Sequence, residues 1–133
     1  MVTVLVAGTF DIFHPGHEDF FRQARMFGDR LVVIVARYAT TLHIKGKAPV
    51  ANEILRLAAV SECSLVDKAR LGNVGDLFSS VVEEKPDVVC LGYDQGMDET
   101  KLKDELRKRG LTVEVHRLKA FKPEIYKSSL LRR

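Results

Sequence analysis

The chain has 133 residues, and 21 Lys and Arg against 18 Asp and Glu give a net charge of +3 at pH 7. So small an excess of positive charge does not by itself indicate a polyanionic partner, and we expect no binding to nucleic acid. With 46% hydrophobic and 29% charged residues, the composition is that of a globular protein. The length favours a single domain over residues 1–133.

Nothing in the sequence resembles a membrane segment or a secretion signal. The longest apolar run, 31–36, is far shorter than the roughly 20 residues that a membrane span requires, and Met1 leads directly into a strand-like segment. The two cysteines, Cys63 and Cys90, lack the spacing of metal ligands and lie in apolar surroundings. We therefore expect buried free thiols in a cytoplasmic protein that has no membrane partner.

The first half of the chain alternates between strand-like and helix-like patterns. Residues 2–7 are almost all apolar and rich in valine, which is typical of a strand buried on both faces. Over 16–27 the apolar residues recur at helical spacing, and Gly28 follows as a stop signal. A second buried strand is predicted over 30–36, then an irregular stretch over 37–49 and a helix over 50–63.

The second half continues the alternation. A short strand is predicted over 66–71, a helix over 76–84 and a strand over 87–91. A charged helix over 98–109 ends at Gly110, a typical residue after a helix C-terminus. A fifth strand is predicted over 112–117, and Ser128 is the candidate N-cap of a short final helix. Strands interleaved with helices predict an α/β fold, a parallel sheet with helices on both faces.

Two polar segments follow predicted strands of this sheet. Gly8–His17 comes after the first strand and Gly92–Gln95 after the fourth. Ligands of open parallel sheets bind beyond the carboxyl ends of the strands, where the strand order reverses. If the two strands are neighbours, both segments border one crevice.

The first of these segments has the properties of a phosphate site. Gly8 allows a sharp turn and close approach of a ligand. Pro15 and Gly16 bring His17 into the first turn of the next helix, where we expect unpaired N–H groups and the positive end of the helix dipole to favour an anion. His14 and His17 are three residues apart, so both rings can reach one phosphate as neutral donors or as cations.

Other roles for the two histidines remain open at this point. They could cap the helix or lie on the surface; the H-x-x-H spacing also occurs in zinc sites, but no suitable third ligand is nearby, so we predict no metal held by the protein alone. Neither histidine lies on the apolar face of the predicted helix. From the sequence we therefore expect both to contribute little to folding.

The segment 37–49 is longer than most loops between a strand and a helix, and such loops are often functional. It carries His43, Lys45 and Lys47 around Gly46. It is either a solvated surface loop or a basic loop that contacts phosphate.

Gly8–His17 matches the G-T-F-D-x-x-H-x-G-H signature and resembles the cytidylyltransferase-like nucleotidyltransferases. The resemblance covers nearly the whole chain and implies a Rossmann-like domain with strand order 3-2-1-4-5. It also implies nucleotidyl transfer, in which a substrate phosphate attacks the α-phosphorus of a nucleoside triphosphate and pyrophosphate leaves. Mg²⁺ bound with the nucleotide and a homodimer are further implications.

The same resemblance assigns roles to individual residues. It implies that His14, His17 and Lys45 are catalytic, with the histidines holding the triphosphate and stabilising the transition state. It also implies that further residues contact the nucleotide through backbone or side chain. They lie in the signature, in the loop 37–49, on the second helix, after the fourth strand and in the tail. These nucleotide-binding positions are Thr9, Phe10, Pro15, Gly16, Lys47, Arg56, Asp94, Ser128 and Ser129.

The segment after the fourth strand narrows the resemblance. Glycerol-phosphate cytidylyltransferases usually have G-D-D-W there and R-T-E-G-I-S-T-T near the end, whereas this chain has Gly92–Gln95 as G-Y-D-Q and a short tail. That form resembles the archaeal FAD synthase group, although Tyr38 stands where that group commonly has Asp. This implies transfer of AMP from ATP to FMN, giving FAD and pyrophosphate.

The residues available around the acceptor also favour FMN. A flavin needs a broad apolar slot, whereas a polyol phosphate needs polar groups for its hydroxyls. The segments 37–42 and 120–126 offer Tyr38, Leu42, Ala120, Phe121, Ile125 and Tyr126. These side chains could equally pack against the sheet.

Three alternatives remain in view. One is a cytidylyltransferase that uses CTP and glycerol 3-phosphate or another polyol phosphate. Another is a nucleotide-binding sensor without turnover, against which the presence of both His14 and His17 argues. A 4′-phosphopantetheine adenylyltransferase is the third, but such enzymes resemble this motif with Thr at the position of His14.

Overall fold

The computed structural model describes residues 1–11, 14–37, 52–76 and 78–120. Its five strands form one parallel sheet, as the sequence pattern predicts, in the order β3-β2-β1-β4-β5 that the family resemblance implies. The elements in chain order are β1 (Thr3–Gly8), α1 (Pro15–Arg25), β2 (Arg30–Val35), α3 (Glu53–Ser61), β3 (Lys68–Leu71), α4 (Ser79–Glu84), β4 (Val88–Leu91), α5 (Glu99–Lys108) and β5 (Glu114–Arg117).

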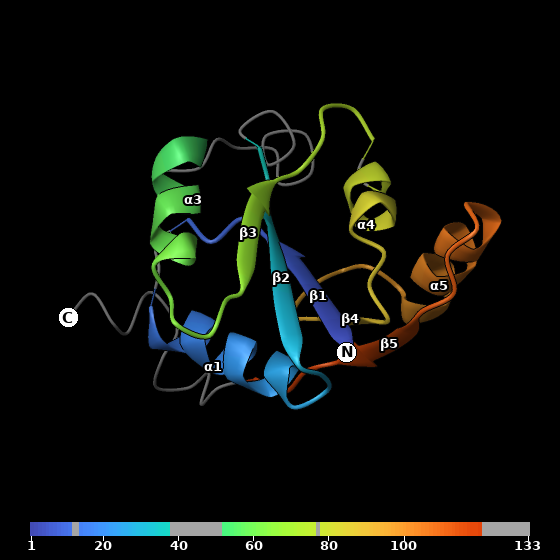
Figure 1. Ribbon diagram of the computed structural model, residues 1–133, viewed down its shortest axis with the longest axis horizontal. Coiled ribbons are helices and arrows are strands. Elements are labelled where there is room, and N and C mark those ends of the chain that lie inside the picture. Colours follow the sequence, from blue (N-terminus) through green and yellow to red (C-terminus); the bar gives the residue numbers. More distant parts are fainter. Residues whose placement is uncertain (12–13, 38–51, 77, 121–133) are drawn as a thin grey trace.

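Helices cover both faces of the sheet (Figure 1), with α1 and α3 on one face and α4 and α5 on the other. Alternate residues of each central strand point to opposite faces, because side chains in a strand have a period of two. In β1, Val4 and Val6 pack under α1 and α3, whereas Leu5 packs under α4 and α5. Both faces of the central strands are therefore buried, which explains their nearly continuous apolar sequences.

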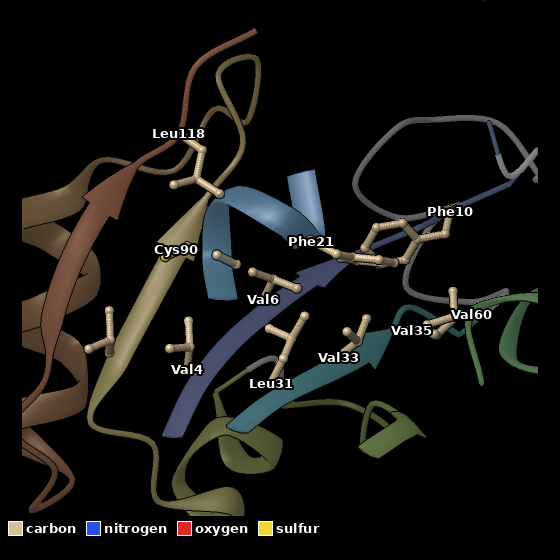
Figure 2. Close-up of a cluster of buried hydrophobic side chains, with 12 residues drawn as sticks. Val4, Val6, Phe10, Phe21, Leu31, Val33, Val35, Val60, Cys90 and Leu118 are labelled. Carbon is tan, nitrogen blue, oxygen red and sulfur yellow. The ribbon is translucent and has the colours of Figure 1, made fainter. Parts of the chain in front are cut away.

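The core under α1 and α3 extends to the carboxyl ends of the central strands. Figure 2 shows Val4 and Val6 of β1 beside Leu31 and Val33 of β2, in a row that leads to the rings of the phenylalanines. Phe21 of α1 is fully buried, and its ring lies 5.3 Å from that of Phe10. Phe10 belongs to the segment that follows β1, so the core packs directly against the loop carrying the sequence motif.

Several predicted elements are shorter in the structure, and local hydrogen bonds explain where they begin. The helix predicted over 50–63 is α3, and it begins after Asn52, whose side chain accepts a hydrogen bond from Leu55 N at 2.8 Å. The helix predicted over 76–84 begins at Ser79, because the Asp76 carboxylate accepts from Phe78 N in a turn. The strand predicted over 66–71 forms from Lys68 onward.

The helix predicted after Ser128 lies outside the described residues. Among the residues that the structure describes, no helix has the length and apolar character needed to cross a membrane.

Replacement of the buried Phe21 tests the packing of α1 on the sheet. We expect Phe21→Ala to lower the free energy of unfolding by about 3–5 kcal/mol, because it leaves a cavity beneath Phe10. Met26→Ala is the matched control, because Met26 follows the same helix and is 83% exposed. It should change the free energy of unfolding by no more than about 0.5 kcal/mol. Urea denaturation measures both; equal losses for the two variants would contradict the packing described.

Candidate active site

The segment after β1 turns sharply because of Phe10. Its φ is 52°, in the left-handed region that a bulky residue rarely adopts. The ring folds back over Gly8, and a Cβ at Gly8 would lie 2.9 Å from it, so this position requires glycine. Phe10 is 6% exposed. Its side chain thus belongs to the core rather than to a nucleotide surface, while a backbone contact to the nucleotide stays a prediction.

His14 occupies the N-cap of α1, and its ring closes the helix end. Its Nδ1 accepts a hydrogen bond from Gly16 N at 3.0 Å, and His17 Nδ1 lies 3.4 Å from His14 N, from which it accepts. The two side chains therefore cap the helix reciprocally. A Cβ at Gly16 would lie 2.7 Å from the His14 ring, so glycine is needed here to let the ring approach.

The capping bonds determine which nitrogen of each ring carries the proton. Because Nδ1 accepts from a backbone N–H in both rings, the neutral form of each carries its proton on Nε2. The two rings are stacked, with centroids 3.9 Å apart and planes 22° apart. Burial also lowers the pKa of His14 from its ordinary value, which favours the neutral ring. His14 is thereby set up as a neutral donor and not as a cation.

These contacts correct two expectations from the sequence. The first-turn amides of α1 are not unpaired, because Gly16 N bonds to the His14 ring and His17 N donates to His14 O at 2.9 Å. An anion at this end would therefore be met by histidine Nε2–H groups rather than by these amides. Moreover, His14 contributes to folding as an N-cap, worth about 1 kcal/mol.

Arg56 of α3 is 1% exposed and supports the ends of two strands. Its Nη1 donates to Thr9 O at 2.9 Å, after β1, and to Ala36 O at 2.6 Å, after β2. Burial lowers the pKa of the guanidinium, and the carboxylates of Asp11 and Glu53 oppose this shift. Arg56 thus holds the backbone beneath the motif, and direct contact of this residue with the nucleotide stays a prediction.

The loop after β4, residues 92–97, is fastened beside the end of β1. The Gln95 side chain donates from Nε2 to Ala7 O at 2.9 Å, and its Oε1 accepts from Gly92 N at 2.7 Å. Arg117 of β5 donates to Gly92 O, Gln95 O and Met97 O at 2.9, 2.6 and 2.6 Å. The same loop carries the exposed Asp94, so the structure brings the two predicted segments together at the edge of the sheet.

The structure thus joins the loop of Asp94 to the end of β1 through Gln95, holds Thr9 from beneath through Arg56, and pairs His14 with His17 at the start of α1. Four predicted residues, Lys45, Lys47, Ser128 and Ser129, lie outside the described residues. Sequence reasoning assigned no role to Gln95 or Arg117. A polar residue at the end of an edge strand, such as Arg117, is unremarkable in a sequence, because its partners are backbone carbonyls of a distant loop.

The tautomer of His14 can be tested by nuclear magnetic resonance of the imidazole nitrogens. We expect the Nε2–H form and a pKa below 6.5, the ordinary value. Because the folded-state pKa is lowered, the contribution of His14 to stability is fully present above the unfolded-state value. It is lost as the pH falls through the window below 6.5. A predominant Nδ1–H form would contradict the capping geometry.

Comparison with known proteins places these observations in a family. The sequence profile described as Cytidylyltransferase-like matches residues 5–133. A protein of Thermoplasma volcanium named FAD synthase is 41% identical over all of this chain and 93% of its own length. A protein of Archaeoglobus profundus with the same name is 52% identical over 90% of this chain and 76% of its own length.

A solved crystal structure has the same fold as this chain. A crystal structure from Thermoplasma volcanium, described as a lipopolysaccharide core biosynthesis protein, superimposes with a TM-score of 0.88 at 43% identity. The alignment covers 92% of this chain and 99% of that protein. The profile match over residues 5–133 and the relatives that are 41% and 52% identical over the aligned residues show that the chain belongs to the cytidylyltransferase-like family.

Proposed function

We propose that the protein transfers AMP from ATP to the phosphate of FMN, giving FAD and pyrophosphate. The observation that carries this proposal is the pair of stacked histidines at the start of α1, whose Nδ1 atoms accept hydrogen bonds from the backbone of the helix end. Family membership supports nucleotidyl transfer as the class of reaction. The name FAD synthase, borne by relatives that match 90–100% of this chain, supports FMN as the acceptor.

The proposed step is an in-line displacement at phosphorus. An oxygen of the FMN phosphate forms a bond to the α-phosphorus of ATP, and the bond from that phosphorus to the bridging oxygen breaks, with its electron pair leaving on pyrophosphate. Negative charge increases on the oxygens around the α-phosphorus and on the leaving group. Fixed donors at those positions stabilise the transition state without reorganising, as preorganised oxyanion sites do.

His14 and His17 supply such donors in this proposal. The His14 ring is fixed by its capping bond, so its Nε2–H can donate to a phosphate without loss of side-chain freedom at the moment of reaction. His17 would hold the same phosphate, as the sequence signature implies. Burial lowers the pKa of His14 and so favours the neutral ring, which stabilises charge by hydrogen bonding. No covalent intermediate with the protein is part of the proposal.

Mg²⁺ is expected to enter with the nucleotide, where it would neutralise phosphate charge. Within the described residues, no group of three or more His, Cys, Asp or Glu side chains is placed to hold a metal ion. Mg²⁺ in phosphoryl-transfer sites is commonly held by one or two carboxylates and by substrate phosphates. The exposed Asp94, on the loop beside β1, fits the role of such a carboxylate.

Further parts of the proposal rest on the sequence. Lys45 and Lys47 would contact the triphosphate, and Ser128 and Ser129 would contact phosphate from the tail. A homodimer and a cytoplasmic location belong to the same set of proposals.

A second candidate is transfer of a nucleotide to a sugar or polyol phosphate. It is favoured by the similar crystal structure whose description refers to lipopolysaccharide core biosynthesis. The first experiment is therefore a crossed assay of ATP and CTP against FMN, glycerol 3-phosphate and ribitol 5-phosphate with Mg²⁺. We expect FAD and pyrophosphate from ATP and FMN; a CDP product without FAD would establish the second candidate instead.

Substitution of His14 separates its cap from its chemistry. Asn is a good N-cap, and its side-chain oxygen can accept from Gly16 N, but it offers no Nε2–H donor. We expect His14→Asn to keep the free energy of unfolding within about 0.5 kcal/mol and to lower kcat by about 10²–10³-fold.

His14→Ala and His17→Ala serve as companions to that variant. Both should lower kcat by a similar factor of about 10²–10³. Both should also lower the free energy of unfolding, since each removes one bond of the reciprocal cap, and the loss in His14→Ala should be about 1 kcal/mol. Turnover of His14→Asn within a factor of about two of wild type would show that the ring does not serve the transition state.

A further inference from the structure

The pairing between β1 and β4 stops before the carboxyl ends of the two strands, where the candidate site lies. β1 pairs with β2 over six residues, from Thr3 to Gly8, but with β4 at only two positions, Val4 with Val88 and Leu5 with Val89. In this register, the ladder continued by two residue pairs, to Ala7 opposite Leu91, would bring Gly92 N to Ala7 O. The carboxamide of Gln95 lies between these two groups instead.

Both ends of that carboxamide are used. Nε2 donates to Ala7 O at 2.9 Å and Oε1 accepts from Gly92 N at 2.7 Å. The side chain therefore replaces one main-chain hydrogen bond by two, and separates the strands by the width of an amide. The separation falls where the strand order reverses, the position at which ligands of such sheets bind.

A second side chain, that of Arg117, holds the loop 92–97 in place beside the Gln95 carboxamide. Arg117 donates from Nη1 to the carbonyls of Gly92 and Gln95 and from Nη2 to that of Met97, and it also pairs with Glu99 at the start of α5. The planar guanidinium thus holds three carbonyls of the loop in one arrangement. Arg117 lies on β5 opposite Leu91, so the loop is tied to the sheet on both sides.

We infer that Gln95 and Arg117 are positioning residues for nucleotide binding. Gln95 acts as a wedge that holds the carboxyl ends of β1 and β4 apart, at the crevice expected where the strand order reverses, and Arg117 fixes the loop of Asp94 at its border. This inference rests on the proposed function, because it assumes that a nucleotide whose phosphates lie at α1 extends across this crevice. It adds to that function two residues that act on affinity without touching the reacting phosphorus.

The wedge predicts an unusual pattern in the variant Gln95→Ala. Without the carboxamide, Gly92 N and Ala7 O can pair directly, so the backbone groups remain bonded while the crevice narrows. We expect KM for ATP to rise by about tenfold or more, since small misplacements of binding groups are costly. We expect kcat to change by less than about threefold, because the histidines on α1 are not displaced.

Gln23→Ala is the matched control. The Gln23 amide also links distant backbone, donating to Lys119 O at 2.9 Å and accepting from Lys119 N at 2.9 Å, but it lies on the later part of α1. It should leave KM for ATP within a factor of about two. Thermal denaturation of both variants compares their stabilities, so a general loss of structure cannot pass for a loss of affinity.

Arg117→Lys and the double variant Gln95→Ala/Arg117→Lys complete the experiment. Lysine keeps the charge but cannot hold three carbonyls at once, so KM for ATP should rise again with kcat nearly unchanged. If both residues act through one loop, the double variant should weaken binding by less than the product of the single effects.

Failure of this inference and failure of the proposed function give different results. If the wild-type protein forms no FAD from ATP and FMN, the acceptor is wrong, and the wedge is then judged by calorimetric titration with ATP or CTP alone. A Kd in Gln95→Ala raised about tenfold relative to wild type and Gln23→Ala supports the wedge. An unchanged Kd in both Gln95→Ala and Arg117→Lys overturns it.

Discussion

The buried ring of Phe10 connects the hydrophobic core to the candidate site. It packs on Phe21 and Phe20, meets the edge of His17 with ring centroids 5.3 Å apart, and lies so close to Gly8 that no side chain fits there. The left-handed backbone at Phe10 is maintained because the core accepts the ring in this place. The direction in which the chain leaves β1, and with it the start of α1, depends on this one packing contact.

The histidine pair shows how the same groups can serve structure and chemistry. Each ring uses Nδ1 for the helix end, and this fixes both the tautomer and the direction of Nε2. A freely rotating surface histidine would have to lose that freedom when substrate binds. Here the capping bonds restrict the rotation of both rings before substrate binds, because these bonds form when α1 forms.

The sequence predicts the order of elements well, because that order follows from local patterns. Continuous apolar runs indicate the buried strands, and the ten-residue signature directly after the first strand indicates the loop and helix start. The tautomers, the burial of Arg56 and the role of Gln95 could not be predicted in this way. The burial of Arg56 and the role of Gln95 depend on backbone groups far away in the chain: Arg56 on Thr9 and Ala36, and Gln95 on Ala7. The tautomers depend on the geometry of the helix end, where each Nδ1 accepts from a backbone N–H two or three residues away. The start of α4 was misplaced for a more local reason, since Asp76 forms a turn with Phe78 where the pattern favours a helix.

The strand order has a consequence for how the chain folds as it is synthesised. One edge of β1 pairs with β2, which follows soon after, but the other edge waits for β4, and Gln95 is 88 residues beyond the carbonyl of Ala7 that it binds. Until that part of the chain has left the ribosome, the central strand presents an unpaired, valine-rich edge. Such an edge can pair with other nascent chains. The second edge of β1 is thus covered later than that of β2, which pairs with β3, and only the second edge of β4, which waits for β5, is covered later still.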